Sequence, residues 1–348
     1  MTHTVKKYML TLMKDERDGF FDVIIKGFLR LFSWVYAAGI KAVDLAWRMK
    51  IRREHKVGIP VVSVGNITLG GTGKTPLVMF LADHLVKEGK RPAILTRGYG
   101  RDESIMLKDE LAEVPVFVGQ DRVRNARLAA SKGAGIVILD DGFQHRRIAR
   151  GVNILLLEAK NPFGNGFLFP RGVLREPVSS IKRADLIVLT KTDKIALKER
   201  EEVLSLIKKI SPASPVVLTR HKAVFLKDVS GLIHPADELS GKKVSLFSGI
   251  ADADYFASLV EGLGAFVSAK DDFTDHHRYS QKDIDHILQQ ASQAEMIITT
   301  SKDYVKVKNF DLSAVEERLY ILYIAIDIIQ GKEFLDAGLD RIMASKSV

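Results

Sequence analysis

Ile59-Pro-Val-Val-Ser-Val64 leads directly into Gly65-Asn-Ile-Thr-Leu-Gly-Gly-Thr-Gly-Lys-Thr75, and this stretch decides the fold. A short apolar run is followed by a glycine-rich loop, and an amphipathic helical pattern begins near Pro76. A strand, a loop ending in Gly-Lys-Thr and a helix are together typical of a phosphate-binding P-loop. Thr68 stands where the usual pattern has its first glycine, so the match is incomplete. The alternative is a glycine-rich turn with a solvated lysine.

The residues of this loop predict how a nucleotide would bind. Backbone N–H groups can point at phosphate oxygens, and the helix N-terminus adds a favourable dipole. The residues expected to provide this cradle are Gly70, Gly71, Thr72 and Gly73. Lys74 can reach the β- and γ-phosphates, and the hydroxyl of Thr75 can ligate Mg²⁺.

Beyond the loop, short runs rich in Val and Ile alternate with helical stretches, which predicts an α/β fold with a mostly parallel sheet of the P-loop NTPase type. Strands are expected over 59–64, 93–96, 114–118, 135–139, 152–157, 186–189 and 216–218, with helices after Lys74, Asp121 and Lys194. Further strands are expected over 244–247, 266–269, 296–299 and 319–325, with helices over 253–263, 281–291 and from 332. We therefore expect an N-terminal helix region over 1–56, a P-loop domain over 57–220 and a smaller α/β domain over 221–348 that closes the cleft.

Two carboxylates follow another buried strand. Asp140 and Asp141 come directly after the strand expected over 135–139. In a sheet whose first strand feeds a P-loop, carboxylates at the carboxyl end of a neighbouring strand lie near the nucleotide's Mg²⁺. One would hold the metal and the other could position water or substrate. The alternative is a strand-end Asp that caps a turn.

The net charge of +9 is concentrated near the N-terminus, where residues 1–56 hold twelve Lys or Arg against six Asp or Glu. Large apolar residues interleave with these cations. The longest uncharged run, 31–40, has ten residues, fewer than the roughly 18 to 20 that a spanning helix needs. The pattern favours an amphipathic helix at the headgroup boundary of a membrane, and no nucleic-acid partner is expected. A helix packed on its own domain is the alternative.

A P-loop leaves the nucleotide and the acceptor open, and a GTPase is the competing interpretation. Thr190-Lys-Thr-Asp193, after the strand expected over 186–189, resembles the guanine-reading element of some GTPases. A GTPase, however, gives no reason for the basic aromatic N-terminal segment or for Asp275-His-His277 in the C-terminal part. A kinase uses a second domain to exclude water during phosphoryl transfer. The chain contains no cysteine, which excludes disulfides and thiolate chemistry.

Six motifs resemble the tetraacyldisaccharide 4'-kinase (lipid A 4'-kinase) family in order and spacing, over nearly the whole chain. They are Ser63-Val-Gly-Asn-Ile-Thr-Leu-Gly-Gly-Thr-Gly-Lys-Thr-Pro76, Thr96-Arg-Gly-Tyr-Gly-Arg101, Leu139-Asp-Asp-Gly-Phe-Gln-His145, Pro162-Phe-Gly-Asn-Gly166 with Pro170 to Pro177, Phe273-Thr-Asp-His-His-Arg-Tyr279 and Thr299-Thr-Ser-Lys-Asp303.

The resemblance implies transfer of the ATP γ-phosphoryl group, with Mg²⁺, to the 4' hydroxyl of a tetraacylated glucosamine disaccharide 1-phosphate in lipid A biosynthesis. It also implies a peripheral, monotopic enzyme at the cytoplasmic face of the inner membrane of a Gram-negative-type envelope. We expect this lipid and the membrane surface to be its partners, and we expect a monomer.

The family pairs an Asp, from a Gly-Asp-Glu-Pro motif, with a histidine of the C-terminal domain to activate the sugar hydroxyl. His276 corresponds to that histidine. The full Gly-Asp-Glu-Pro motif is absent from this chain, and two Asp-Glu pairs compete for its place. We prefer Asp102, since it follows the strand over 93–96 at the phosphate end of the sheet, and Asp109 is the alternative. Asp102 would orient His276 while His276 takes the hydroxyl proton.

Three further residues are candidates for substrate contacts. His145 matches the family's histidine after the Asp pair. Arg171 and Arg175 lie in the Gly- and Pro-rich loop after Gly166, and arginine forms bidentate contacts with phosphate groups. The alternative for both arginines is an ordinary place on the surface of the loop.

Overall fold

The computed structural model describes residues 3–98 and 101–344 and divides into two compact units. Unit 1 comprises Met1–Arg97, Glu113–Arg220 and Ile328–Val348, and unit 2 comprises Gly98–Ala112 and His221–Asp327. The contiguous division expected from the sequence differs from this at two places. Residues 98–112 belong to unit 2 because their helix packs on a helix of that unit, and the last segment returns to unit 1.

The sheet of unit 1 is parallel and has the strand order β7-β6-β5-β1-β4-β2-β3. The strands are β1 (Val61–Asn66), β2 (Pro92–Thr96), β3 (Val116–Val118), β4 (Ile136–Leu139), β5 (Val152–Glu158), β6 (Leu186–Thr190) and β7 (Val216–Asp228). Every residue of β1 is buried, since β4 and β5 flank it. A strand buried on both faces reads as a continuous apolar run, which is why the sequence revealed it.

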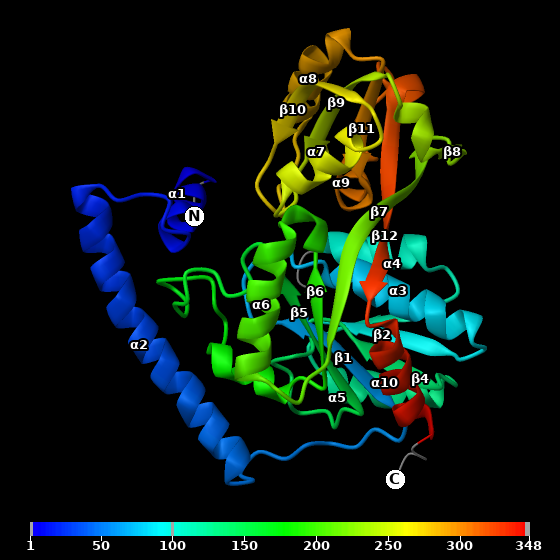
Figure 1. Cartoon of the computed structure of the whole chain (residues 1–348). Helices are drawn as coiled ribbons and strands as arrows, with labels where there is room; N and C mark the ends of the chain where they lie inside the picture. Colours follow the sequence, from blue (N-terminus) through cyan, green and yellow to red (C-terminus); the bar gives the residue numbers. More distant parts are fainter. Residues whose placement is uncertain (1–2, 99–100, 345–348) are drawn as a thin grey trace. The chain divides into compact units, whose positions relative to one another are not determined.

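Helices cover this sheet (Figure 1). They are α3 (Lys74–Lys87), α5 (Arg122–Ser131), α6 (Leu197–Ile210) and α10 (Lys332–Ala344), with α1 (His3–Met13) and α2 (Phe20–Arg48) preceding them and the 3-10 turns η1 (Val178–Arg183) and η2 (Thr192–Lys194) between β5 and α6. Ala93 and Leu95 of β2 pack in one cluster with Ala126 and Ala129 of α5. Because side chains alternate along a strand, Ile94 faces the opposite side of the sheet.

Helix α2 has an unusual distribution of polarity. Its buried residues are polar, namely Asp22, Lys26 and Ser33, whereas the apolar residues Phe21, Phe28, Phe32 and Val35 are between 58% and 75% exposed. The 29-residue helix is long and apolar enough to cross a membrane by length and composition. The sequence-based estimate considered only the ten uncharged residues over 31–40, so it underestimated the apolar length.

Unit 2 is a smaller α/β unit with the strand order β10-β9-β11-β12-β7, and β8 pairs antiparallel with β7. Its elements are α4 (Arg101–Glu110), β8 (Ile233–Pro235), η3 (Ala236–Leu239), β9 (Lys243–Ser248), α7 (Ala253–Glu261), β10 (Phe266–Asp272), α8 (Gln281–Gln290), η4 (Ala291–Gln293), β11 (Met296–Thr300), α9 (Ser301–Val307), η5 (Glu316–Arg318) and β12 (Leu319–Gln330). Two apolar clusters form its core, one containing residues of α7 and the other residues of α8.

The mostly parallel α/β fold predicted from the sequence is confirmed. Several features differ from the sequence-based expectation. Strand β7 runs for 13 residues rather than over 216–218, and both β7 and β12 carry the chain from one unit to the other. Strand β8 and the helices α4 and α9 were not expected, because each is short and lacks a clear apolar period.

Candidate active site

The glycine-rich loop lies between β1 and α3 in unit 1, as its sequence predicts. Gly73 has φ +83° and precedes the first turn of α3, a left-handed conformation that favours glycine. The amide of Asn66, at the end of β1, donates to Thr68 O at 2.9 Å and to Thr72 Oγ1 at 3.0 Å. Lys74 and Thr75 are the first two residues of α3, where the helix dipole favours an anion.

The Thr190-Lys-Thr-Asp193 segment supports the loop from the end of β6. Thr190 Oγ1 donates to Thr72 O at 3.0 Å, and Lys191 Nζ donates to Gly71 O at 3.0 Å. Lys191 is buried and has φ +54°, a strained conformation for a residue with a side chain. Two residues of the segment therefore hold the phosphate loop, while Asp193 is exposed.

The two predicted metal carboxylates follow β4. Asp140 is buried, and its N–H donates to Leu95 O at 2.9 Å. Asp141, at φ +48°, accepts hydrogen bonds from both terminal nitrogens of Arg175, at 2.8 and 3.1 Å. Burial opposes ionisation of Asp141, but Arg175, together with the charges of Lys74 and an arginine of α5, outweighs it and holds the pKa of Asp141 below its usual range.

The arginine of α5 is Arg122, which the sequence analysis did not single out. Its Nη1 donates to Asp141 O at 3.1 Å, and its side chain is buried. Burial lowers the pKa of Arg122, against the opposing effect of Asp140 and Asp141. No local motif marked this residue, because only the packing of α5 brings it to the end of β4.

His145 follows the same turn and is a neutral group. Burial is the main reason why its pKa falls to about 4, and nearby arginines, Arg122 foremost, lower it further. Its buried Nε2 has no hydrogen-bond partner among the described residues. At neutral pH it therefore presents an uncharged imidazole nitrogen.

The two loop arginines have different surroundings. Arg175 holds Asp141, as described above. Arg171 is 8% exposed, pairs with Asp15 at 2.6 Å and lies over the ring of Phe167, 4.7 Å from its centroid. Arg171 therefore fastens the segment between α1 and α2, and neither arginine is an ordinary surface residue.

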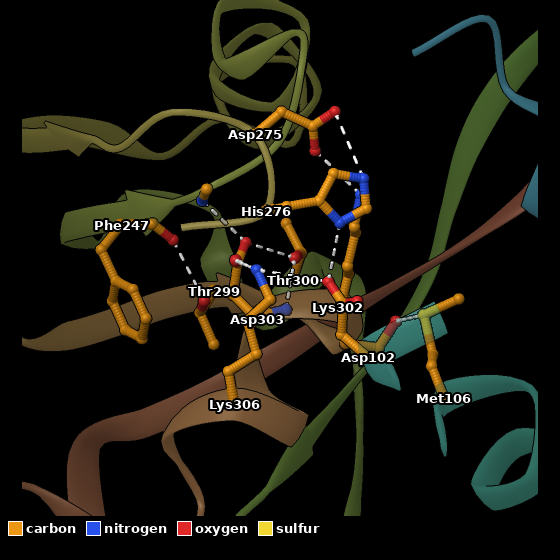
Figure 2. A network of polar contacts seen from close by, with 12 residues as sticks. Asp102, Met106, Phe247, Asp275, His276, Thr299, Thr300, Lys302, Asp303 and Lys306 are labelled. Atoms are coloured by element: carbon orange, nitrogen blue, oxygen red, sulfur yellow. Dashed lines mark hydrogen bonds and ion pairs between the residues drawn. The ribbon is translucent and has the colours of Figure 1, made fainter. Parts of the chain in front are cut away.

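The predicted dyad lies within unit 2 (Figure 2). His276 Nδ1 and Asp102 Oδ2 are 3.2 Å apart. Asp102 is in the first turn of α4, whereas His276 is in the loop after β10 with φ +60°. The alternative partner, Asp109, is at the other end of α4 and pairs with Lys308 at 3.0 Å. Of the two candidates, the structure brings Asp102 to His276.

The two groups stabilise each other's charged form. Burial opposes ionisation of Asp102, but the hydrogen bond and charge of His276, followed by Lys302 and Lys306, lower its pKa to about 2. The hydrogen bond to Asp102 is the main reason why the pKa of His276 is raised. A carboxylate that orients an imidazole and favours its protonated form suits general base catalysis on a hydroxyl. Tyr99 and Gly100 of the neighbouring motif lie outside the described residues.

Comparison with known proteins decides the family. Residues 25–344 match the LpxK family, described as tetraacyldisaccharide-1-P 4'-kinase. The chain belongs to the tetraacyldisaccharide 4'-kinase family. It is 37% identical to the tetraacyldisaccharide 4'-kinase of Desulfatibacillum aliphaticivorans, over 88% of this chain and 90% of that protein. It is 34% identical to the tetraacyldisaccharide 4'-kinase of Halothermothrix orenii, over 94% of this chain and 96% of that protein.

A solved member of the tetraacyldisaccharide 4'-kinase family shares the fold. The crystal structure of LpxK from Aquifex aeolicus in complex with ATP matches with a TM-score of 0.71 and 29% identity, covering 92% of this chain and 99% of that one. The predicted family, its kinase activity and its place in lipid A biosynthesis are confirmed. The GTPase interpretation is therefore wrong.

Proposed function

We propose that this tetraacyldisaccharide 4'-kinase transfers the γ-phosphoryl group of ATP, with Mg²⁺, to the 4' hydroxyl of a tetraacyl glucosamine disaccharide 1-phosphate. The observation that carries the proposal is the 3.2 Å contact between His276 Nδ1 and Asp102 Oδ2 in unit 2. Unit 1 separately supplies the glycine-rich loop that leads into α3. ATP is favoured because the related Aquifex aeolicus structure is described in complex with ATP. Both units must act on the same phosphoryl group.

The nucleotide would bind to the loop of unit 1. Backbone N–H groups over 70–73 would meet its phosphates, and Lys74 would neutralise charge on the transferred group. Mg²⁺ prefers oxygen ligands and usually takes only one or two carboxylates, which fits the hydroxyl of Thr75 with Asp140 and Asp141. When bound, the ion would neutralise charge on the phosphates. The low pKa of Asp141 keeps that carboxylate ionised for such a role.

The sugar hydroxyl would give its proton to the dyad. With Asp102 ionised, the Nδ1 hydrogen of His276 donates to Oδ2, and Nε2 is left to accept the hydroxyl proton. The imidazolium that forms is stabilised by the Asp102 carboxylate. Because catalysis needs the neutral imidazole, kcat should fall as the pH drops through the pKa of His276, which lies above its ordinary value.

Three residues are proposed for substrate phosphates and positioning. Arg175 could exchange part of its contact with Asp141 for phosphate oxygens, since guanidinium binds both groups in the same bidentate way. The neutral His145 offers a hydrogen bond at the same end of the sheet. Arg171, which pairs with Asp15 in the segment before α2, is proposed for the 1-phosphate of the lipid.

Helix α2 is proposed to attach the enzyme to the cytoplasmic face of the inner membrane without crossing it. Ser33 Oγ donates to Leu168 O at 2.9 Å, and Tyr36 OH donates to Arg175 O at 3.0 Å, so the middle of the helix is bonded to its own unit. The outer face is apolar and exposed, which suits insertion at the headgroup boundary. A single chain supplies every proposed group, and we propose a monomer.

Vesicle sedimentation tests the attachment. Phe28→Ser combined with Phe32→Ser should weaken binding at least tenfold, because about 1.5 to 3 kcal/mol of burial is lost for each ring. Leu206→Ser removes an exposed apolar residue from α6 instead and should leave binding unchanged. Undiminished binding of the double variant would refute attachment through this face.

The kinase proposal is tested by phosphate transfer from radiolabelled ATP to a tetraacyl disaccharide 1-phosphate in detergent micelles. His276→Ala should lower kcat by about 10² to 10⁴, as expected for loss of a general base. The matched control is His286→Ala, because His286 also pairs with a carboxylate, Asp271, at 3.2 Å in unit 2. Equal activity of the two variants would refute the dyad, and equal transfer from GTP would refute the preference for ATP.

A further inference from the structure

Lys302 of α9 forms ion pairs with two carboxylates, and each of them is next in the chain to a residue of the dyad. Its Nζ is 2.9 Å from Asp275 Oδ1 and 3.3 Å from Glu103 Oε1. Asp275 directly precedes His276, and Glu103 directly follows Asp102. The lysine side chain is 17% exposed, so the contacts form in a largely buried place where ion pairs are little screened. Figure 2 shows Lys302 between the helix that bears Asp102 and the loop that bears His276.

A second lysine, one turn further along α9, lies close to the carboxylate of Asp102. Lys306 Nζ is 3.8 Å from Asp102 Oδ2 and 2.8 Å from Asp303 Oδ1. Asp303 is fully buried and accepts hydrogen bonds from Gly249 N and Thr300 Oγ1, at 2.9 and 2.8 Å. Lys306 is therefore anchored to the core of unit 2, and its charge acts on Asp102 from a fixed position.

The loop that carries His276 needs such support. A non-glycine residue at φ +60° is strained and persists only where its surroundings hold it. The contact with Asp102 is one restraint on His276. The pairing of Asp275 with Lys302 is a second restraint, one residue away. Among the described residues, Lys302 forms no hydrogen bond with the ring of His276, because its Nζ is already shared between two carboxylates.

We propose that Lys302 is a positioning residue for phosphoryl transfer, which holds His276 against Asp102 by pairing with Asp275 and Glu103 at once. The proposal rests on the Asp102–His276 dyad proposed above. Lys302 touches neither nucleotide nor sugar in this role. It fixes the distance between α4 and the histidine loop, and a misplacement of a catalytic group by about 1 Å can cost about 10² in rate.

In the same arrangement, the charges of Lys302 and Asp275 have opposite effects on the pKa of His276. The charged groups that face His276 are Asp102 from α4, Asp275 from its own loop and Lys302 from α9. The charge of Lys302 lowers the pKa of His276, whereas the charge of Asp275 raises it. Removing the lysine charge should therefore raise the pKa of His276, and removing the Asp275 charge should lower it.

The experiment compares kcat against pH in detergent micelles for wild type, Lys302→Met, Lys302→Arg and Asp275→Asn. Lys302→Met should lower kcat by about tenfold or more and move the acidic limb of the profile to higher pH. Asp275→Asn should move that limb to lower pH, and Lys302→Arg should restore much of kcat. The KM for ATP should stay unchanged in all three variants, because the nucleotide residues belong to unit 1.

Lys308→Met is the matched control, because Lys308 directly follows α9 and pairs with the exposed carboxylate of Asp109. It should keep the wild-type rate and profile. An NMR titration of His276 in each variant gives the same pKa shifts without any turnover. Unchanged kcat in Lys302→Met, or a loss of kcat in which neither the limb nor the His276 pKa moves, would overturn the proposal. Failure of the dyad itself would be recognised separately, by wild-type activity of His276→Ala.

Discussion

Two carboxylates of the candidate active site face different kinds of cation. Asp141, in unit 1, accepts two hydrogen bonds from the guanidinium of Arg175, whose charge does not titrate near neutral pH. Asp102, in unit 2, faces the imidazole of His276, and imidazole is the side-chain group that ordinarily gains and loses a proton near neutral pH. In the proposed mechanism, unit 1 would offer fixed charge to phosphate and metal, whereas unit 2 would offer a group that can move a proton.

In this comparison, the larger effect should come from removing a fixed charge of unit 1 rather than the Asp102 carboxylate of unit 2. Lys74→Ala should lower kcat by about 10³, because positioning and charge neutralisation supply most of the rate of phosphoryl transfer. Single-turnover transfer from ATP is the measurement. The control is Lys87→Ala, at the other end of α3, where the lysine pairs with Asp83 on the surface. Indistinguishable rates for the two variants would remove the loop from the mechanism.

The proposed role of unit 2 in proton transfer is tested by Asp102→Asn. Loss of the carboxylate should lower kcat by about 10². Since the hydrogen bond from His276 to Asp102 raises the pKa of the histidine, its removal should also move the acidic limb of the kcat profile to lower pH. Asp109→Asn alters the alternative carboxylate on the same helix and should leave rate and profile unchanged. Similar losses of kcat in Asp102→Asn and Asp109→Asn would contradict the assignment of Asp102, rather than Asp109, as the partner of His276.

A smaller effect is expected when the cation beside Asp141 is removed. Arg175→Met should lower kcat by about tenfold, the loss that follows from one charge-assisted hydrogen-bonded pair. It should also lower the Mg²⁺ concentration for half-maximal rate, because the guanidinium then no longer competes for the carboxylate. Titration of activity with Mg²⁺ measures both quantities. Arg175→Lys is the comparison variant, because it keeps the charge but not the bidentate geometry. A higher Mg²⁺ requirement in Arg175→Met would contradict competition between the guanidinium and Mg²⁺ for Asp141.

The smallest effect concerns Glu110, a carboxylate at the opposite end of α4 from Asp102. Burial raises its pKa from 4.5 to about 6, and it borders a cavity of about 170 Å³. A carboxyl whose folded pKa is raised stabilises the fold below its unfolded pKa, and this contribution is lost as the pH rises through the folded value. Glu110→Gln should therefore exceed wild type in unfolding free energy by up to about 2 kcal/mol at pH 8.

Urea denaturation at pH 8 and pH 4.5 measures this difference. The advantage of Glu110→Gln should disappear at pH 4.5, where the wild-type carboxyl is protonated in the folded protein. Glu113→Gln, on the exposed segment after α4, is the control and should match wild type at both values. An advantage that is the same at both pH values would contradict the assigned cause.

The parts of the site that the sequence predicted are contiguous in the chain. The strand, loop and helix proposed to bind phosphate occupy 61–87, and Asp140 and Asp141 directly follow an apolar strand. Local composition is enough to recognise them, since strand burial and helix initiation are decided by near neighbours. The fold class followed from the same alternation of short apolar runs and helices.

The dyad and its supports could not be derived locally. Asp102 and His276 are separated by 174 positions, so their pairing was expected only through family resemblance. Lys302 and Arg122 were missed, because a single cation on a helix gives no sign of which carboxylates the packing will bring to it. The helix that bears Asp102 was also not expected, since the first turn of α4 has no apolar period.

The return of the chain to unit 1 after β12 has a consequence for synthesis on the ribosome. Leu335, Leu339 and Ile342 of α10 are buried, and α10 packs on β5 and β6 beside the strand that feeds the phosphate loop. Every residue of unit 2 has been made once Asp327 is added, whereas unit 1 still lacks this helix. We therefore expect the sequence of unit 2 to be complete before that of unit 1, and a chain clipped before α10 to transfer no phosphate from ATP.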